Sequence, residues 1–132
     1  MMKPLLFVFF IFFYFPANSG IQADILEDLA VQFKNGNSKE IAKNFSSSVE
    51  LLIIEQEDVY SKAQAEQILK DFFVKNPPIK TSIVHAVNSN PKYRYGVISL
   101  QTKNSKFRVN VTLMLHKTSN VFLITELRIE KD

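Results

Sequence analysis

The chain of 132 residues has the length of one domain, and a chain of this size can bury a core without the support of a metal or a disulfide. It contains no cysteine, which excludes a disulfide framework and zinc sites built on thiolates, and its two histidines lie far apart in the sequence. Only Gly36 and Gly96 follow residue 20, so a glycine-rich phosphate loop is missing as well. We therefore expect neither a metal site nor a cofactor.

The formal net charge of +3 conceals an asymmetry along the chain. Residues 24–71 contain ten acidic and five basic side chains, whereas residues 72–125 contain eight basic side chains and no acidic one. The basic residues alternate with apolar residues instead of clustering, which is typical of the solvated face and turns of a sheet and does not favour nucleic-acid binding. An anionic small ligand or an anionic envelope polymer is the alternative partner.

The N-terminus has the pattern of a signal peptide. Lys3 precedes an unbroken apolar run over residues 5–15, and Pro16 and small residues follow the run. The run is shorter than the roughly 20 residues that a transmembrane helix needs. We expect a signal peptide over residues 1–23, one domain over residues 24–132, and a soluble periplasmic or secreted product without a membrane anchor. The alternative is an N-terminal segment that is not cleaved.

Two short helices are predicted first. Apolar residues recur at helical spacing over residues 24–35, and Gly36 offers a C-terminal stop. Asn37, with Glu40 three residues later, resembles a capping box for a second helix that continues through Phe45.

A strand and a third helix come next. Residues 49–55 are mostly β-branched or aliphatic, which indicates a strand. Ser61 and Gln64 form the Ser-x-x-Gln version of a capping box, and apolar residues then recur at helical spacing until Asn76 and two prolines end the helix.

From residue 79 onward the apolar period changes to two, which indicates strands joined by short turns and hence antiparallel neighbours. Four strands are predicted, over residues 79–88, 93–102, 106–117 and 121–130. The core residues predicted for the last strand are Val121, Leu123, Leu127 and Ile129. Helices followed by such a meander predict an α+β domain in which three helices pack on one face of a curved antiparallel sheet.

Three segments resemble a known superfamily. FKNGNSKEIAKNFSSSVEL (residues 33–51) contains a Gly-Asn pair between two helices, VYSKAQAEQILKDFF (59–73) ends in paired aromatic residues, and FRVNVTLML with VFLITELRIEKD covers the last two strands. Together they resemble the nuclear transport factor 2-like superfamily, and in particular a bacterial exported family of unknown function with that fold. The resemblance implies a cone-shaped domain with a cavity between the third helix and the sheet. It implies no single activity, because the superfamily contains both enzymes and binding modules.

The resemblance also implies where an enzyme of this superfamily would carry its carboxylates, on the inner strands of the sheet. Residues 72–125 contain no Asp or Glu, and Glu126 and Glu130 are out of phase with the core positions Leu127 and Ile129. Because a carboxylate base must lie within hydrogen-bond reach of the proton that it removes, we expect a non-enzymatic binding or interaction domain of unknown ligand.

His85 is the candidate for a catalytic residue. It is in phase with Ile83, which would direct its side chain at the core or a pocket, where a lone histidine is more often a hydrogen-bonded structural residue. A general base would need orienting groups, and the candidates for the same pocket are Tyr60, Tyr95 and Arg108. The alternative function is therefore a small-molecule isomerase, dehydratase or hydrolase that uses His85.

A candidate interface lies on the face opposite the core. By strand parity this face carries Met114, Phe122 and Ile124, joined by Ile98 and Leu100, with charged residues around them. An apolar patch with a charged rim suggests an interface, although single exposed apolar residues are normal on any surface. Because pairing through the sheet is common in the superfamily that the chain resembles, we expect a homodimer through this outer sheet face.

Overall fold

The structure, a computed structural model, describes residues 25–132, so the predicted signal peptide lies outside the described residues. The helices are α2 (Ile25–Lys34), α3 (Ser38–Ala42) and α4 (Lys62–Lys75). The strands are β1 (Phe45–Ile53), β2 (Gln56–Ser61), β3 (Pro78–Val87), β4 (Tyr93–Thr102), β5 (Lys106–His116) and β6 (Val121–Lys131). No helix within this range has the length and hydropathy needed to cross a membrane.

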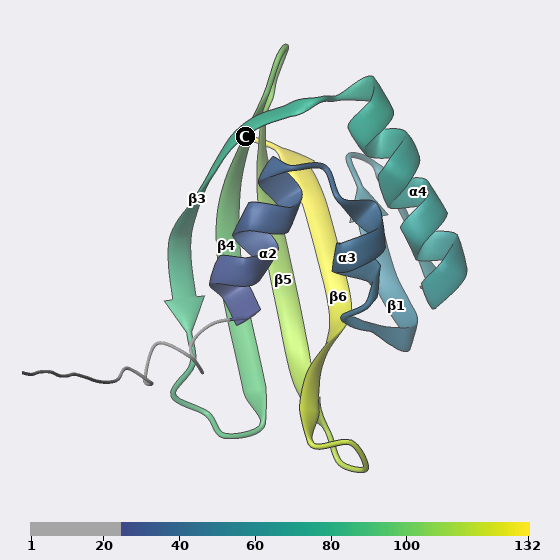
Figure 1. Cartoon of the computed structure of the whole chain (residues 1–132), viewed down its shortest axis with the longest axis vertical. Helices are drawn as coiled ribbons and strands as arrows, with labels where there is room; N and C mark the ends of the chain where they lie inside the picture. The colour runs from purple at the N-terminus through teal and green to yellow at the C-terminus, as the bar shows by residue number, and fades with distance from the viewer. Residues whose placement is uncertain (1–24) are drawn as a thin grey trace, which may run out of the picture.

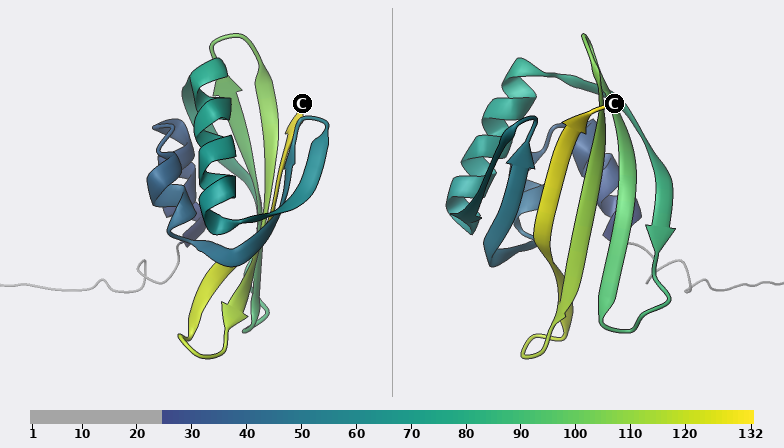
Figure 2. Two further views of the ribbon diagram at one scale, coloured as in Figure 1. Left: turned by 90° about the vertical axis from the view of Figure 1, so that its right-hand side faces the viewer. Right: turned by 180° about the vertical axis from the view of Figure 1, so that it is seen from behind.

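The strands form one sheet in the order β2-β1-β6-β5-β4-β3. All neighbours are antiparallel except β1 and β6, which pair in parallel. The three helices lie on one side of this curved sheet, and the other side carries none of them (Figure 1, Figure 2). We call these sides the inner and the outer face. The predicted α+β class, with three helices on one face of the sheet, is confirmed.

The two short helices are confirmed with one correction at the end of α3. Gly36 follows α2 in the left-handed conformation (φ +62°), and the Asn37 side chain caps α3 by accepting a hydrogen bond from the Glu40 amide at 3.2 Å. The prediction that this second helix continues through Phe45 is wrong. Phe45 already begins β1, where it pairs with Ile124 and is buried.

The third helix, α4, is confirmed. Ser61 accepts a hydrogen bond from the Gln64 amide at 3.2 Å, and the Gln64 side chain accepts one from the Ser61 amide at 3.0 Å, which completes the capping box. Its paired aromatics enter the core, where the Phe72 ring meets those of Phe73 and Phe107 edge to face. The helix α4 is therefore packed on the inner face of the sheet through these aromatic side chains.

One hairpin stands where a single strand is predicted. The chain turns back after Ile53 through Ile54 and Glu55, and β2 then pairs with β1. Turns of this length favour Asn, Asp or Gly, and neither residue is of that type. The hairpin therefore could not be predicted from its turn residues.

The four long strands are confirmed to within one residue at each end. Two of them contain a bulge. On β3, Ile83 pairs with Ile98 and His85 with Val97, which leaves Val84 as an extra residue, and an earlier register shift in the same strand leaves out Ile79. On β6, Thr112 and Leu113 pair with Glu126 and Ile124, which leaves Thr125 as an extra residue. Since side chains alternate between faces, each bulge reverses the parity of everything beyond it.

Candidate functional site

The predicted pocket residues do not come together. His85 is exposed on the outer face because the bulge at Val84 reverses its parity, so the prediction that it points at the core or a pocket is wrong. Its ring meets that of Tyr95 on the same face, 6.4 Å between centroids. Arg108 is also on the outer face, whereas Tyr60 packs against the core from β2 on the inner face.

The predicted interface residues divide in the same way. Ile124 is 0% exposed in the core, and Phe122 packs against that core on the inner face with the Arg94 guanidinium 4.3 Å from its ring centroid. Their assignment to the outer face is wrong because the bulge at Thr125 shifts the phase of β6. Ile98 is also in the core, as is Leu100. Only Met114 lies on the outer face, where it is 43% exposed.

Met114 belongs to a different apolar group, which we call the outer apolar patch. It pairs with Tyr93 on β4 and with Leu123 on β6, so these three side chains form a row across three strands. The next pair along the strands is Val87 with Tyr95. Met114 is exposed and the two tyrosines are half-buried, and aromatic and Met side chains are enriched at protein interfaces.

The β3–β5 side of the outer face carries three cations, which we call the basic half. Lys80 and Lys106 both pair with Gln101, and Arg108 lies one row further along, opposite Ser99. All three cations are exposed, and within residues 25–132 none forms an ion pair of 4 Å or less. No acidic residue occurs on these three strands.

The β2–β1–β6 side of the same face is the acidic half. Its charged residues on the outer face are Glu57 on β2, Glu50 on β1, and Glu126, Arg128 and Glu130 on β6. Four carboxylates and one guanidinium give this half a formal charge of −3, against +3 for the basic half. The outer face is thus divided into two halves of opposite sign.

Arg128 organises the acidic half. Its guanidinium is 3.2 Å from a Glu57 oxygen and 3.7 Å from oxygens of both Glu126 and Glu130. Leu52 lies between Glu57 and Arg128 in the register, so the ion pair passes over β1, in line with the burial of Leu52 on this face. One cation among three carboxylates fixes their positions but leaves the surface negative.

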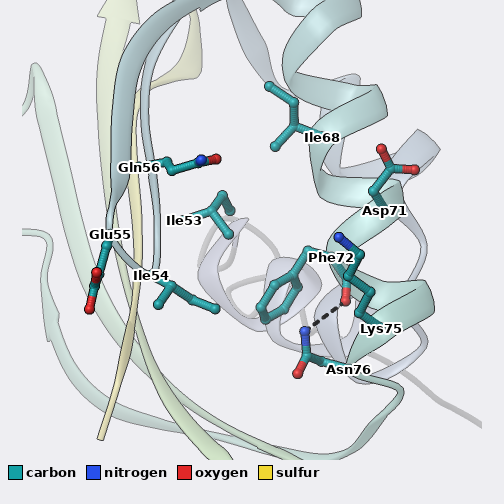
Figure 3. A pocket seen from close by; sticks show the side chains of 9 residues that line it. All are labelled: Ile53, Ile54, Glu55, Gln56, Ile68, Asp71, Phe72, Lys75 and Asn76. Atoms are coloured by element: carbon teal, nitrogen blue, oxygen red, sulfur yellow. Dashed lines mark hydrogen bonds between the residues drawn. The ribbon is translucent and has the colours of Figure 1, made fainter.

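A cavity of about 420 Å³ opens elsewhere, between α4 and the β1–β2 turn (Figure 3). It lies beside the helix that was expected to cover a cavity, but none of the predicted pocket residues lines it. The lining residues are Ile53, Ile54, Glu55, Gln56, Ile68, Asp71, Phe72, Lys75 and Asn76. Four of these nine residues belong to the β1–β2 turn and its flanks, and the sequence did not predict that turn.

The comparisons with known proteins agree with this fold. A family model described as a domain of unknown function (DUF4783) matches residues 26–130. No curated protein matches the chain. A solved DUF4783 family protein from Bacteroides uniformis is 27% identical, with 83% of this chain and 98% of that chain covered and a TM-score of 0.77. For one from Bacteroides fragilis the identity is 28%, the coverages are 83% and 100%, and the TM-score is 0.74.

More distant structures share the fold alone. A nuclear transport factor 2-like protein of unknown function from Silicibacter pomeroyi is 12% identical, with 81% of this chain and 89% of that chain covered and a TM-score of 0.57. The resemblance to a family of unknown function with the nuclear transport factor 2-like fold is confirmed.

Proposed function

The chain belongs to the DUF4783 family, whose function is unknown, and we propose that it is a non-enzymatic interaction domain that pairs with a second copy of itself through the outer sheet face. The observation that carries this proposal is the division of that face into a basic and an acidic half. A surface that is complementary to itself is what a two-fold symmetric dimer requires, because each subunit contributes the same patch. Opposite charges that meet across such an interface also set its register.

The order of the strands decides the direction of the symmetry axis. Two sheets that meet face to face are related by an axis lying in the plane between them. An axis that runs along the strands, between β5 and β6, puts β5 over β6 of the partner, β4 over β1 and β3 over β2. The basic half of each copy then covers the acidic half of the other.

The outer apolar patch is compatible with the same axis. Because rotation about an axis along the strands keeps each row at its own height, the row of Met114 meets the same row of the partner, with Met114 over Leu123. Packed sheets lie about 10 Å apart, close enough for these side chains to touch. Burial of this patch would supply affinity, and the charges would supply orientation.

The proposal is tested with two variants of opposite sign. The first, Lys80→Glu with Lys106→Glu and Arg108→Glu, makes both halves acidic. The second, Glu50→Lys with Glu126→Lys, changes the acidic half from −3 to +1. In sedimentation equilibrium we expect wild type to dimerise, each variant alone to stay monomeric, and an equimolar mixture of the two to form heterodimers.

The control for net charge is on the helical side of the molecule. Lys39→Glu with Lys62→Glu and Lys70→Glu changes the net charge by the same amount as the first variant, and these exposed lysines are on α3 and α4. This control should dimerise like wild type. A wild-type protein that remains monomeric at every accessible concentration would overturn the proposal.

The same samples decide the alternative occupant of the basic half, an anionic polymer. If wild type stays monomeric and is retained on heparin resin, with retention that falls steeply with salt and is lost in the first variant, polymer binding replaces pairing as the function. The enzymatic alternative gains no support, because His85 is exposed beside Tyr95 on the outer face and lines no part of the cavity at α4.

Export of the protein is part of the proposal. Lys3, the apolar run over residues 5–15 and the small residues after Pro16 support a cleaved signal peptide. Mass spectrometry of the protein from a periplasmic or culture fraction should give the mass of a chain that begins near residue 20 or 24. A cell-associated chain that retains its first residues would contradict export.

A further inference from the structure

The turn between β1 and β2 contains a strained backbone. Ile54 has φ +62°, in the left-handed region that β-branched residues rarely adopt. Its amide donates a hydrogen bond to the Ile129 carbonyl at 2.7 Å, which ties the turn to β6. Residues held in such conformations are concentrated at ligand sites and switches, so the strained backbone of Ile54 indicates a function for this turn.

The Ile54 side chain forms part of the wall of the cavity. It is 37% exposed and lines the cavity together with the partly buried side chains of Ile53 and Ile68 (Figure 3). A glycine or asparagine would suit the backbone of the turn better, but it would remove an apolar wall of the cavity. Ile54 is therefore unfavourable for the turn and favourable for an apolar ligand.

The floor of the cavity is fixed. Phe72 is a core residue, and its ring packs edge to face on Phe73 and Phe107 with centroids 5.6 and 5.2 Å away. Aromatic contacts of this geometry hold a ring in one orientation. The volume of about 420 Å³ lies within the range of roughly 300–1,000 Å³ that is usual for small-molecule sites.

The charged groups at the rim are the carboxylates of Glu55 and Asp71 and the ammonium of Lys75. The carboxylates of Glu55 and Asp71 are directed away from the cavity (Figure 3). Asp71 accepts a hydrogen bond from Gln67 at 3.2 Å. Lys75 lines the cavity at the C-terminal end of α4, where its positive charge offsets the partial negative charge of the helix terminus. The inside of the cavity therefore offers an ionic ligand no dedicated partner, because the carboxylates face outward and the ammonium is engaged by the helix terminus.

Two amides supply the directional contacts. The Gln56 amide extends across the cavity toward Ile68 (Figure 3). The Asn76 amide nitrogen donates to the Phe72 carbonyl at 3.1 Å, which leaves its oxygen as an acceptor. We infer that this cavity binds an uncharged, mainly apolar small molecule that carries one hydroxyl or amide group.

This site is separate from the outer face, so it goes beyond the proposed pairing. The two proposals fail independently, because the ligand contacts α4 and the β1–β2 turn whereas the second copy contacts the other side of the sheet.

The test uses three probes with the same chain length and different head groups: 1-octanol, octanoate and octylammonium. Titrated into the isotope-labelled protein, octanol should cause saturable amide shifts within residues 53–56 and 68–76. Both ions should bind at least ten-fold more weakly. If octanol produces no saturable shifts in these two segments, or if either ion binds as tightly, the inference is wrong.

Variants of Ile54 separate a ligand site from a structural hollow. Ile54→Gly and Ile54→Asn should raise the melting temperature, because the turn is no longer strained, and should weaken octanol binding by about five-fold, because an apolar wall is lost. Val74→Ala, an exposed apolar truncation on α4 outside the cavity, should leave the affinity unchanged. An unchanged affinity in both Ile54 variants would exclude the turn from the site.

Discussion

Leu113 on β5 pairs directly with Ile124 on β6, and both side chains are fully buried in the core. One residue earlier on β5, Thr112 pairs with Glu126 on the outer face. The extra residue, Thr125, lets a strand that ends in Glu126, Arg128 and Glu130 on its outer face present Ile124 to the core. The bulge thus decides which side chains are available to a partner.

The first prediction concerns Ile124 and Met114, which strand parity assigns to the same face but which the structure places on opposite faces of the sheet. Ile124→Ala should lower the free energy of unfolding by about 2–5 kcal/mol, because it leaves a cavity in the core. Met114→Asp should change it by less than about 0.5 kcal/mol, since the side chain is exposed, while weakening self-association. Urea unfolding of the two variants checks the difference. Equal stability losses would contradict the phase shift.

The second prediction concerns the bulge itself. Deletion of Thr125 should prevent folding or leave a loosely packed state, because one end of β6 would have to turn Ile124 and Phe122 out of the core. Deletion of Ser119, in the exposed turn between β5 and β6, is the matched control and should cost far less. Circular dichroism and amide NMR spectra distinguish the two. A well-folded protein without Thr125 would show that the residue does not set the phase of the strand.

The third prediction concerns a contact between α2 and β4. A Cβ at Gly96 would lie 2.6 Å from Leu26 Cδ2, and Leu26 is buried and cannot swing away freely. Gly96→Ala should therefore lower the free energy of unfolding by about 1–3 kcal/mol. Combined with Leu26→Ala it should cost less than the sum of the two single changes, because the clash is gone. Additive losses would mean that the two residues do not compete for the same space.

Much of the fold could be predicted because its signals are local. Ser61 and Gln64 mark the start of α4, and the alternation of apolar residues indicates where the long strands begin and end. The bulges could not be predicted, since Val84 and Thr125 are ordinary strand residues and nothing distinguishes them from their neighbours. The predictions that His85 points into a pocket and that Ile124 lies on the surface are both wrong because these bulges were not recognised.

The candidate sites depend on pairings between distant parts of the chain. The basic half could be anticipated from the run of basic residues after residue 72, since Lys80, Lys106 and Arg108 all come from it. The acidic half could not, because it needs the parallel pairing of β1 with β6 and the unrecognised strand β2, which carries Glu57. The cavity could not be predicted for the same reason, because Ile54, in the unrecognised β1–β2 turn, forms part of its wall.

The pairing of two outer faces is tested most directly by site-specific cross-linking, for which a chain without cysteine is well suited. Thr112 lies on the outer face of β5 next to β6, beside the proposed axis, so Thr112→Cys should give a covalent dimer with a short bismaleimide. Lys62→Cys, exposed on α4, is the matched control and should stay monomeric. Efficient cross-linking at residue 62 and none at residue 112 would contradict pairing through the outer sheet face.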